Sequence, residues 1–470
     1  MLTDAIMTIA KKAGGQIGAR SLSGVFASLC LAATGAAFGQ VNITGVFPDD
    51  QVQWQITVPA NWNGVVVNDL DRVTSASIAN VLLPLGYAYT GTARAPDRGT
   101  NWDPRRESND MVRVLDIFES QFGRARRTIQ YGCSGGGSTA QSVAEDHPTR
   151  FDGVVAVEAS SPVVVANMRL DITFALKALL DINNQLPLVV HDGQTAAAEQ
   201  TWINVLNAAQ QTAQGRARMA LAVVLAQYPE WGSNNTPQAP RPAPSDFTAV
   251  QAGLVRVAVD AARIAITSRP QWDDPAGFMS WNTGVDYKQF YANANVKHKA
   301  IVAFMYAQAG LSVDADLDQI NAAPRLAGTN DSVNYWRSRT HTGIPGVPML
   351  QVHDLGDART PVSGTAGYEM EVQRFGGTAR QLLYRQAFID IPGHCTLSSA
   401  EMVAAIETMI QRIDSGAWGN LDSPDAMNAL GRASGLGPSR FVLPSILLGY
   451  VPPAVLNRAF DPTSPGPPTP

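Results

Sequence analysis

This 470-residue chain lacks several features that would place it in other protein classes. It has no dense cluster of Lys or Arg in its body, and its formal net charge is −5. Because binding to nucleic-acid phosphates needs concentrated positive charge, nucleic acid is not expected as the main partner. A neutral or mildly polar substrate is expected instead. No internal repeat is apparent, and the N-terminal apolar run is too short to span a membrane.

The first residues have the order of a secretory signal peptide. Basic residues precede an apolar stretch at 25–33, and small residues come directly before Gln40. This order is typical of a signal peptide, so we expect residues 1–39 to be removed and the protein to be secreted or periplasmic. A buried N-terminal helix is the alternative reading of the same segment.

Cysteine is scarce, with three residues in the whole chain. Cys30 lies in the expected signal peptide, so the mature chain would keep Cys133 and Cys395. Two cysteines are an even number in an exported protein, where disulfides form and persist. A bond between them would close a loop of about 262 residues, which the chain-entropy model values at roughly 5 to 6 kcal/mol as an upper figure.

The rest of the sequence alternates between strand-like and helix-like patterns. A helix with one apolar face is expected from Met111 to Phe122, with Gly123 as its end. Alternation of this kind predicts a mostly parallel sheet covered by helices, a core formed by residues 40–160 and 348–450. The expected strands lie at 52–58, 64–68, 86–90, 127–131, 153–157, 349–353 and 382–391.

Residues 161–347, called the insert below, have a different pattern. They contain Ala- and Leu-rich helical stretches, such as 170–180 and 196–228, without strand-like alternation. A proline-rich break at 232–245 predicts an extended loop. We expect the insert to form a helical lid, and we expect the proline-rich tail at 451–470 not to pack.

A G-x-S-x-G motif at residues 132–136 lies between an expected strand and an expected helix. This context is typical of a nucleophile elbow, which makes Ser134 the candidate nucleophile. An acid and a histidine should follow, each after a later strand. Asp357 follows the strand at 349–353, and His394 follows the next one. The order Ser, Asp, His is that of an α/β-hydrolase.

The chemistry assigns each residue a role. Serine is a weak nucleophile, so His394 would take the proton of Ser134 and later protonate the leaving group. Asp357 would orient the imidazole and stabilise its charged form. The oxyanion would be bound by the backbone N–H of Gly135 and by a second N–H from the loop that holds Leu70 and Asp71.

Other polar residues are alternatives to these. Asp354 is three residues before Asp357, and a one-turn error in the loop would exchange them. His353 is expected to be a core or supporting residue, and His147 a cap at the end of the helix after Ser134. The remaining histidines, which lie in the insert without partners at metal-ligand spacing, are His191, His298 and His341.

No cofactor is expected, although the insert contains one acidic run. Asp314, Asp316 and Asp318 alternate along the chain and could bind calcium through oxygen ligands, but the glycine turns and closing acid of an EF-hand are missing. A solvated acidic loop is the simpler interpretation. Most aromatic residues of the insert are expected to form its core, with one or two facing Ser134: Trp281, Tyr287, Phe290, Tyr291, Phe304, Tyr306, Tyr335 and Trp336.

Taken together, Cys133-Ser134, Asp357 and His394-Cys395 resemble the Cys-Ser, Asp, His-Cys signature of the tannase and feruloyl esterase family. The family pairs its two cysteines in a disulfide beneath the triad and inserts a lid between the nucleophile and the acid. The resemblance implies an α/β-hydrolase fold and carboxylic-ester hydrolysis, with esters of aromatic acids as expected substrates. The chain lacks the additional cysteines and the glycine-punctuated calcium loop that are usual in the family.

The leading hypothesis is therefore an exported serine esterase that acts through an acyl-enzyme on a small-molecule or oligomeric ester. The same three residues could open a lactone, cleave a polyester or attack an amide as a serine peptidase. A binding protein that keeps the fold without catalysis is the alternative from a different class.

Overall fold

The computed structural model describes residues 39–98, 101–232, 240–243, 245–268 and 280–443. The expected signal peptide, apart from Gly39, and the expected proline-rich tail lie outside these residues. Within them, every helix is too short or too polar to cross a bilayer.

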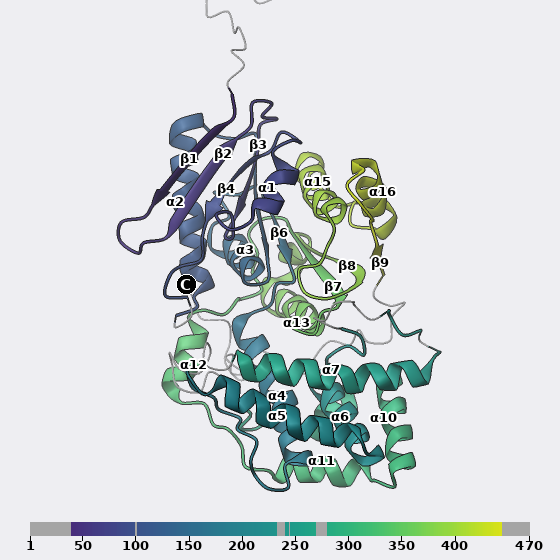
Figure 1. Cartoon of the computed structure of the whole chain (residues 1–470). Helices are drawn as coiled ribbons and strands as arrows, with labels where there is room; N and C mark the ends of the chain where they lie inside the picture. Colours follow the sequence, from purple (N-terminus) through teal and green to yellow (C-terminus); the bar gives the residue numbers. More distant parts are fainter. Residues whose placement is uncertain (1–38, 99–100, 233–239, 244, 269–279, 444–470) are drawn as a thin grey trace, which may run out of the picture. The chain divides into compact units, whose positions relative to one another are not determined.

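Nine strands of the described chain form one sheet, in the order β1-β2-β4-β3-β5-β6-β7-β8-β9 (Figure 1). The strands from β4 to β8 in this order are parallel to one another, and antiparallel pairs occur at both edges. The mostly parallel sheet confirms the expected α/β-hydrolase fold. The strands are β1 (Val41–Val46), β2 (Gln53–Val58), β3 (Val65–Asp69), β4 (Ala88–Thr92), β5 (Arg127–Cys133), β6 (Gly153–Val157), β7 (Met349–Gly356), β8 (Tyr384–Pro392) and β9 (Phe441–Val442).

Helices cover both faces of this sheet, and each face has its own apolar core. One face packs against α2 (Pro104–Phe122) and α3 (Gly135–Asp146). The other packs against α1 (Ala76–Leu82), α15 (Ser399–Ser415) and α16 (Pro424–Ser434). Burial on both faces explains why the central strands are continuous apolar runs.

Local signals set the ends of α2. Asp103 accepts the N–H groups of Arg105 and Arg106, and Pro104 occupies the first turn, so the helix starts seven residues earlier than the apolar pattern alone indicated. Gly123 ends it at φ 75°, as expected from the sequence. Strands β1 and β9 were not predicted, because an edge strand is half-exposed and carries no long apolar run.

The described part of the insert is helical, and its helices share a separate apolar core (Figure 1). The helical stretch expected at 196–228 is split after Gln210, because the side chain of Thr212 accepts the N–H of Gly215 and starts a new helix. The helices are α4 (Pro162–Leu180), α5 (Thr195–Gln210), α6 (Ala213–Leu225), α7 (Phe247–Thr267), α9 (Tyr287–Asn293), α10 (Val296–Ala309), α11 (Val313–Ala322) and α12 (Asn330–Arg337).

Most of the aromatic residues named in the sequence analysis pack in or against this core. Phe304 is the exception, because it lies on α10 with 51% of its surface exposed.

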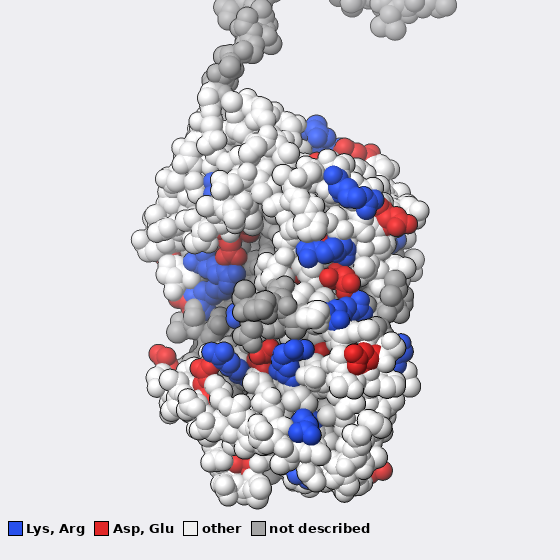
Figure 2. Space-filling view, turned by 45° about the vertical axis from the view of Figure 1, so that its right-hand side comes forward, with Lys and Arg blue, Asp and Glu red and all other residues white. Residues whose placement is uncertain are grey.

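The segment from β7 to β8 crosses through α13 (Ser363–Glu371), the π-helical turn η1 (Val372–Gly376) and α14 (Gly377–Gln381). On the face drawn in Figure 2, Lys and Arg side chains occur in small groups separated by uncharged surface. This face therefore has no continuous basic surface of the kind that binds a nucleic-acid backbone.

Candidate active site

Ser134 occupies a sharp turn between β5 and α3. Its backbone has φ 57° and ψ −119°, a conformation that costs energy in a residue with a side chain. Two glycines make room for the turn, because a Cβ at Gly132 would collide with Gly136 and a Cβ at Gly137 would collide with the carbonyl of Val157. The motif therefore forms the tight strand-turn-helix that a nucleophile elbow requires.

Asp357 and His394 meet at the carboxyl edge of the sheet. Asp357 follows β7, His394 follows β8, and the Nδ1 of His394 lies 2.8 Å from the Oδ2 of Asp357. The other carboxylate oxygen of Asp357 accepts the N–H groups of Arg359 and Thr360, at 2.7 and 2.9 Å. Burial by itself would raise the pKa of Asp357, but the charge and hydrogen bond of His394 outweigh it and hold this pKa below its usual value.

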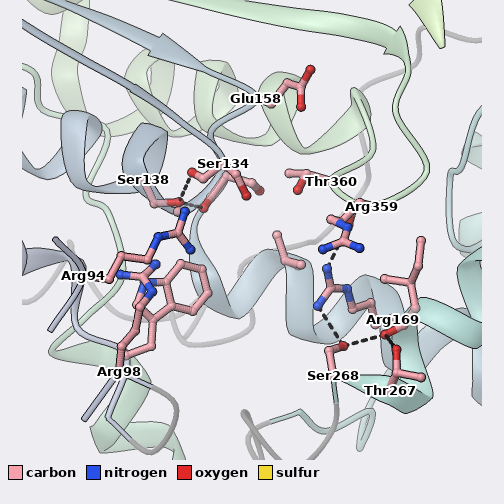
Figure 3. A pocket seen from close by; sticks show the side chains of 15 residues that line it. Arg94, Arg98, Ser134, Ser138, Glu158, Arg169, Thr267, Ser268, Arg359 and Thr360 are labelled. Atoms are coloured by element: carbon pink, nitrogen blue, oxygen red, sulfur yellow. Dashed lines mark hydrogen bonds between the residues drawn. The ribbon is translucent and has the colours of Figure 1, made fainter. Parts of the chain in front are cut away.

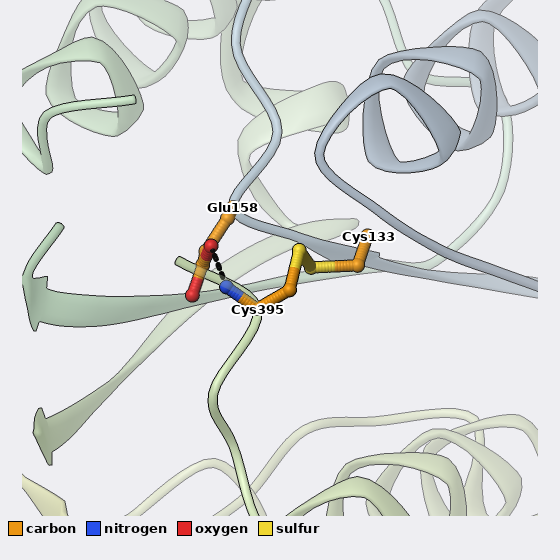
Figure 4. A group of neighbouring side chains, drawn as sticks. All are labelled: Cys133, Glu158 and Cys395. Atoms are coloured by element: carbon orange, nitrogen blue, oxygen red, sulfur yellow. Dashed lines mark hydrogen bonds between the residues drawn. A yellow bond between two sulfur atoms is a disulfide. The ribbon is translucent and has the colours of Figure 1, made fainter. Parts of the chain in front are cut away.

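A second carboxyl group, not predicted from the sequence, contacts the same nitrogen. Glu158 directly follows β6, is fully buried, and has its Oε2 2.8 Å from the Nδ1 of His394. It also accepts the N–H of Cys395 (Figure 4). Burial, and then the charge of Asp357, raise the pKa of Glu158 well above its usual value. Two carboxyl groups on one imidazole do not both ionise readily, so Asp357 is the charged partner and Glu158 the neutral one.

Two further residues support this group. Asp354 accepts the N–H and the hydroxyl of Thr396, at 3.1 and 2.9 Å, and burial raises its pKa well above the usual value. His353 is buried, with its ring nitrogens 2.7 Å from the Thr360 carbonyl oxygen and from the Thr365 hydroxyl. Of the two candidate acids, Asp357 contacts His394, and Asp354 holds the following loop through Thr396.

The disulfide joins the two halves of the site. Cys133 and Cys395 are bonded, with their Cα atoms 6.1 Å apart (Figure 4). They are the neighbours of Ser134 and His394, so the bond limits how far these segments can separate. In this structure the Nε2 of His394 is buried and makes no hydrogen bond within the described residues, including Ser134. Such bonds are often long in enzymes without substrate.

The expected oxyanion donors surround the start of α3. Gly135 is the first residue of this helix, where backbone N–H groups have no partner inside the helix. The loop after β3 packs against Gly136, with Asp71 and Leu70 as its neighbours. The N–H of Asp71 already donates to the Asp69 carboxylate at 3.1 Å. This bond favours Leu70 as the second donor, and both assignments stay predictions.

A cavity of about 290 Å³ opens beside Ser134 (Figure 3). Four arginines line it, two from the loop after β4, one from α4 and one from the loop after β7. None was singled out in the sequence, because they come from chain segments far apart. They are Arg94, Arg98, Arg169 and Arg359. Trp102, Val165 and Ile264 supply apolar parts of the lining, whereas Asp357 and His394 do not reach it.

The other histidines have structural contacts. His147, at the end of α3, lies 3.2 Å from the hydroxyl of Ser108. His298 lies 2.9 Å from Glu230 inside the insert. His341 is buried against α3, with its ring nitrogens near Ser161 and the Ser138 carbonyl oxygen, at 2.9 and 2.8 Å.

The acidic run of the insert lies on α11. Asp316 accepts hydrogen bonds from Arg218 at 2.9 Å and from Tyr306 at 3.0 Å, and Asp318 pairs with Lys288 at 2.5 Å. A calcium ion would have to displace these cations. The expectation of calcium in the insert stays a prediction, and the pairing does not favour it.

Comparison with known proteins gives one related sequence of high coverage. No family model matches the chain. The o-phthalyl amidase of Xanthobacter agilis is 36% identical over 423 residues, which are 84% of this chain and 91% of that protein.

Solved structures with lower similarity include three fungal proteins. An esterase from Aspergillus oryzae is 14% identical, with 80% of each chain covered and a TM-score of 0.40. Feruloyl esterase B from the same organism is 15% identical, with 80% of this chain and 81% of that chain covered and a TM-score of 0.39. Tannin acyl hydrolase from Aspergillus niger is 13% identical, with 81% and 79% covered and a TM-score of 0.37. At 36% identity over 84% of this chain, the amidase shows that this chain belongs to the o-phthalyl amidase family and is a hydrolase.

Proposed function

We propose that the protein hydrolyses a carboxylic ester or amide bond of an aromatic acid, with Ser134 as the nucleophile. The proposal rests on one arrangement of residues. A disulfide joins the segment of Ser134, which lies at a strained turn, to the segment of His394, whose Nδ1 lies 2.8 Å from Asp357. Nucleophile, base and orienting acid are the parts that covalent acyl transfer needs.

The reaction has two halves. The Oγ of Ser134 attacks the carbonyl carbon while the Nε2 of His394 takes its proton, and the N–H of Gly135 binds the oxyanion. The tetrahedral intermediate collapses, the bond to the leaving alcohol or amine breaks, and His394 protonates that group. Water, deprotonated by the same nitrogen, then attacks the acyl-enzyme and releases the acid. The ionised Asp357 stabilises the imidazolium in both halves.

Two observations support an aromatic acyl group. Trp102, Val165 and Ile264 give the cavity beside Ser134 an apolar portion that can contact a ring. The related protein is named for the removal of an o-phthalyl group, which contains such a ring, and its name also favours amides beside esters.

Initial rates on a matched panel test the proposal. Methyl ferulate, methyl gallate, a phthalyl monoamide, p-nitrophenyl acetate, a lactone and a peptide anilide would be compared with wild type and Ser134→Ala. We expect turnover of aromatic acyl substrates that the variant lacks, and labelling of the wild type alone by a fluorophosphonate. Equal hydrolysis by Ser134→Ala would contradict the nucleophile, and fast cleavage of the aliphatic ester alone would contradict the aromatic preference.

We also propose export of the mature chain, on the order of residues in its first 39 positions. N-terminal sequencing of protein recovered from the periplasm or medium should start near Gln40. Recovery of the full-length chain in the cytosol would contradict export.

A further inference from the structure

The cavity beside Ser134 holds more positive charge than an uncharged substrate needs. In Figure 3, Arg94 and Arg98 lie on one side of Ser134, and Arg169 and Arg359 lie on the other. Glu158 is the acidic residue of the described lining, and it is the carboxyl group whose pKa is raised well above its usual value. The lining therefore presents four guanidinium groups and one carboxyl group.

Two of these arginines are held by acids behind the lining. Arg94 makes a two-point ion pair with Asp71, at 2.7 and 2.9 Å. Arg98 is buried, pairs with Glu107 and stacks on Trp102 with its guanidinium 4.8 Å from the ring centre. Both side chains have their geometry set by protein contacts, as is usual for paired guanidinium groups.

Arg359 differs from these two. Arg359 is exposed, and its guanidinium makes no ion pair or hydrogen bond with the described residues. Its backbone is nevertheless anchored, because its N–H donates to Asp357 and its carbonyl oxygen accepts a hydrogen bond from Nη2 of Arg169 at 3.1 Å. The side chain of Arg359 therefore extends from an anchored backbone beside Asp357 into the cavity, where its guanidinium N–H groups can donate to a ligand.

We propose that Arg359 is the residue that recognises an ionised carboxylate on the substrate. This inference rests on the proposed function for its reaction and adds a residue that sets its specificity. A planar guanidinium with open donors suits a carboxylate in two-point geometry. The overall charge predicts a neutral or mildly polar substrate, and the proposed substrate departs from it because the net charge of a whole chain does not set the charge of one cavity.

Matched pairs of substrates test the proposal. On the acyl side, monomethyl phthalate carries the carboxylate and dimethyl phthalate lacks it; on the leaving-group side, phenyl acetate is compared with its ring-carboxylated form. We expect the wild type to favour the charged member of one pair, which tells where the carboxylate sits. Arg359→Ala should lower the charged-to-neutral ratio of kcat/KM about 10- to 100-fold, mainly through KM, and Arg359→Lys should lower it less.

Arg432→Ala is the control for loss of one positive charge, because Arg432 is exposed on α16 and does not line the cavity. It should leave the ratio unchanged. An equal loss on charged and neutral substrates in Arg359→Ala, or a wild-type preference for the neutral members of both pairs, would overturn the proposal.

A binding measurement separates this inference from the reaction. Calorimetry with the Ser134→Ala protein and free phthalate needs no turnover. We expect binding that weakens at higher ionic strength and is lost in the double variant with Arg359→Ala. Binding that is equal in both proteins would refute the role of Arg359 even if hydrolysis is confirmed. Arg359-dependent binding without any hydrolysis would instead refute the proposed function and keep the site.

Discussion

At the scale of single residues, the feature that most affects catalysis is the pair of carboxyl groups on His394. Asp357 and Glu158 both lie 2.8 Å from its Nδ1, yet their pKa values are shifted in opposite directions. Neighbouring titratable groups whose pKa values are pushed apart have different roles. Asp357 supplies a negative charge beside His394. Glu158 is the neutral carboxyl group, and it holds the loop after β8 by accepting the N–H of Cys395.

This division of roles predicts unequal effects of two amide substitutions. Glu158→Gln resembles the protonated acid and should keep kcat/KM within about tenfold of wild type. Asp357→Asn removes the charge and should lower kcat by about 10⁴-fold, as loss of the acid does in other triads. The two rates would be measured on one ester at pH 7 to 8. If Glu158→Gln is the more damaging variant, the ionised acid is Glu158.

The raised pKa of Glu158 also predicts how stability depends on pH. The folded protein keeps a proton that the unfolded chain releases above its ordinary pKa of 4.5, so stability falls as pH rises from there toward the folded pKa. Glu158→Gln cannot ionise. Its free energy of unfolding should therefore rise relative to wild type as pH increases, measured by urea unfolding at several pH values. A constant difference would show that Glu158 keeps its ordinary pKa.

At the scale of elements, the site depends on how segments from different strands are tied together. The elbow after β5 and the loop after β8 are joined by the disulfide, and the end of the insert is joined to α3 by His341. The disulfide thus positions the two loops of the site, and the hydrogen bond of His341 positions the end of the insert.

Loss of the disulfide should reduce activity before it unfolds the protein. Without the bond, the Ser134 and His394 segments can move apart, and the chain-entropy model allows a stability loss of up to roughly 5 kcal/mol. The paired Cys133→Ser and Cys395→Ser variant would be assayed at a temperature where circular dichroism shows it folded. Unchanged kcat would show that strand packing alone positions the site.

His341 should make the contact between insert and α3 sensitive to acid. Burial lowers its pKa from 6.5 to about 3, so the unfolded chain takes up a proton in this range while the folded chain does not. Its contribution is present above pH 6.5 and is lost as pH falls toward 3, by an amount of order a few kcal/mol. The stability difference between wild type and His341→Gln should therefore shrink on acidification, in a series of chemical unfolding curves. A pH-independent difference would contradict the shift.

At the scale of the whole molecule, the insert and the sheet have separate apolar cores but form one compact unit from Gly39 onward. Arg105 of α2 reaches the carbonyl oxygen of Thr340 at 2.8 Å, and Glu145 of α3 accepts the N–H groups of Thr342 and Gly343. Such contacts lead us to expect that the two parts unfold together.

A substitution deep in the insert tests this expectation. Trp202 is buried in the insert and donates to the Pro187 carbonyl oxygen at 3.0 Å. Trp202→Ala should cost about 3 to 5 kcal/mol. Heat should then remove helical signal and hydrolytic activity at the same lowered temperature. Two separate transitions would show that the insert unfolds independently.

Features that depend on neighbours along the chain could be predicted from the order of the amino acids. The alternation of strands and helices predicted the parallel sheet, and the glycines around Ser134 predicted the strand-turn-helix that the structure contains. The positions of Asp357 and His394 after successive strands placed them at one edge, because parallel strands end there together. Their catalytic roles remain proposals.

The side chains that meet at that edge could not be predicted in this way, because they depend on how distant segments pack. Glu158 carries no motif, and its contact with His394 arises because the parallel strands β6, β7 and β8 lie in this order and end at the same edge of the sheet. The four arginines come from segments between residues 94 and 359 that gather only when α4 and the loop after β7 pack near α3. Spacing along a chain records local geometry, whereas the charge of a cavity depends on which distant segments face it.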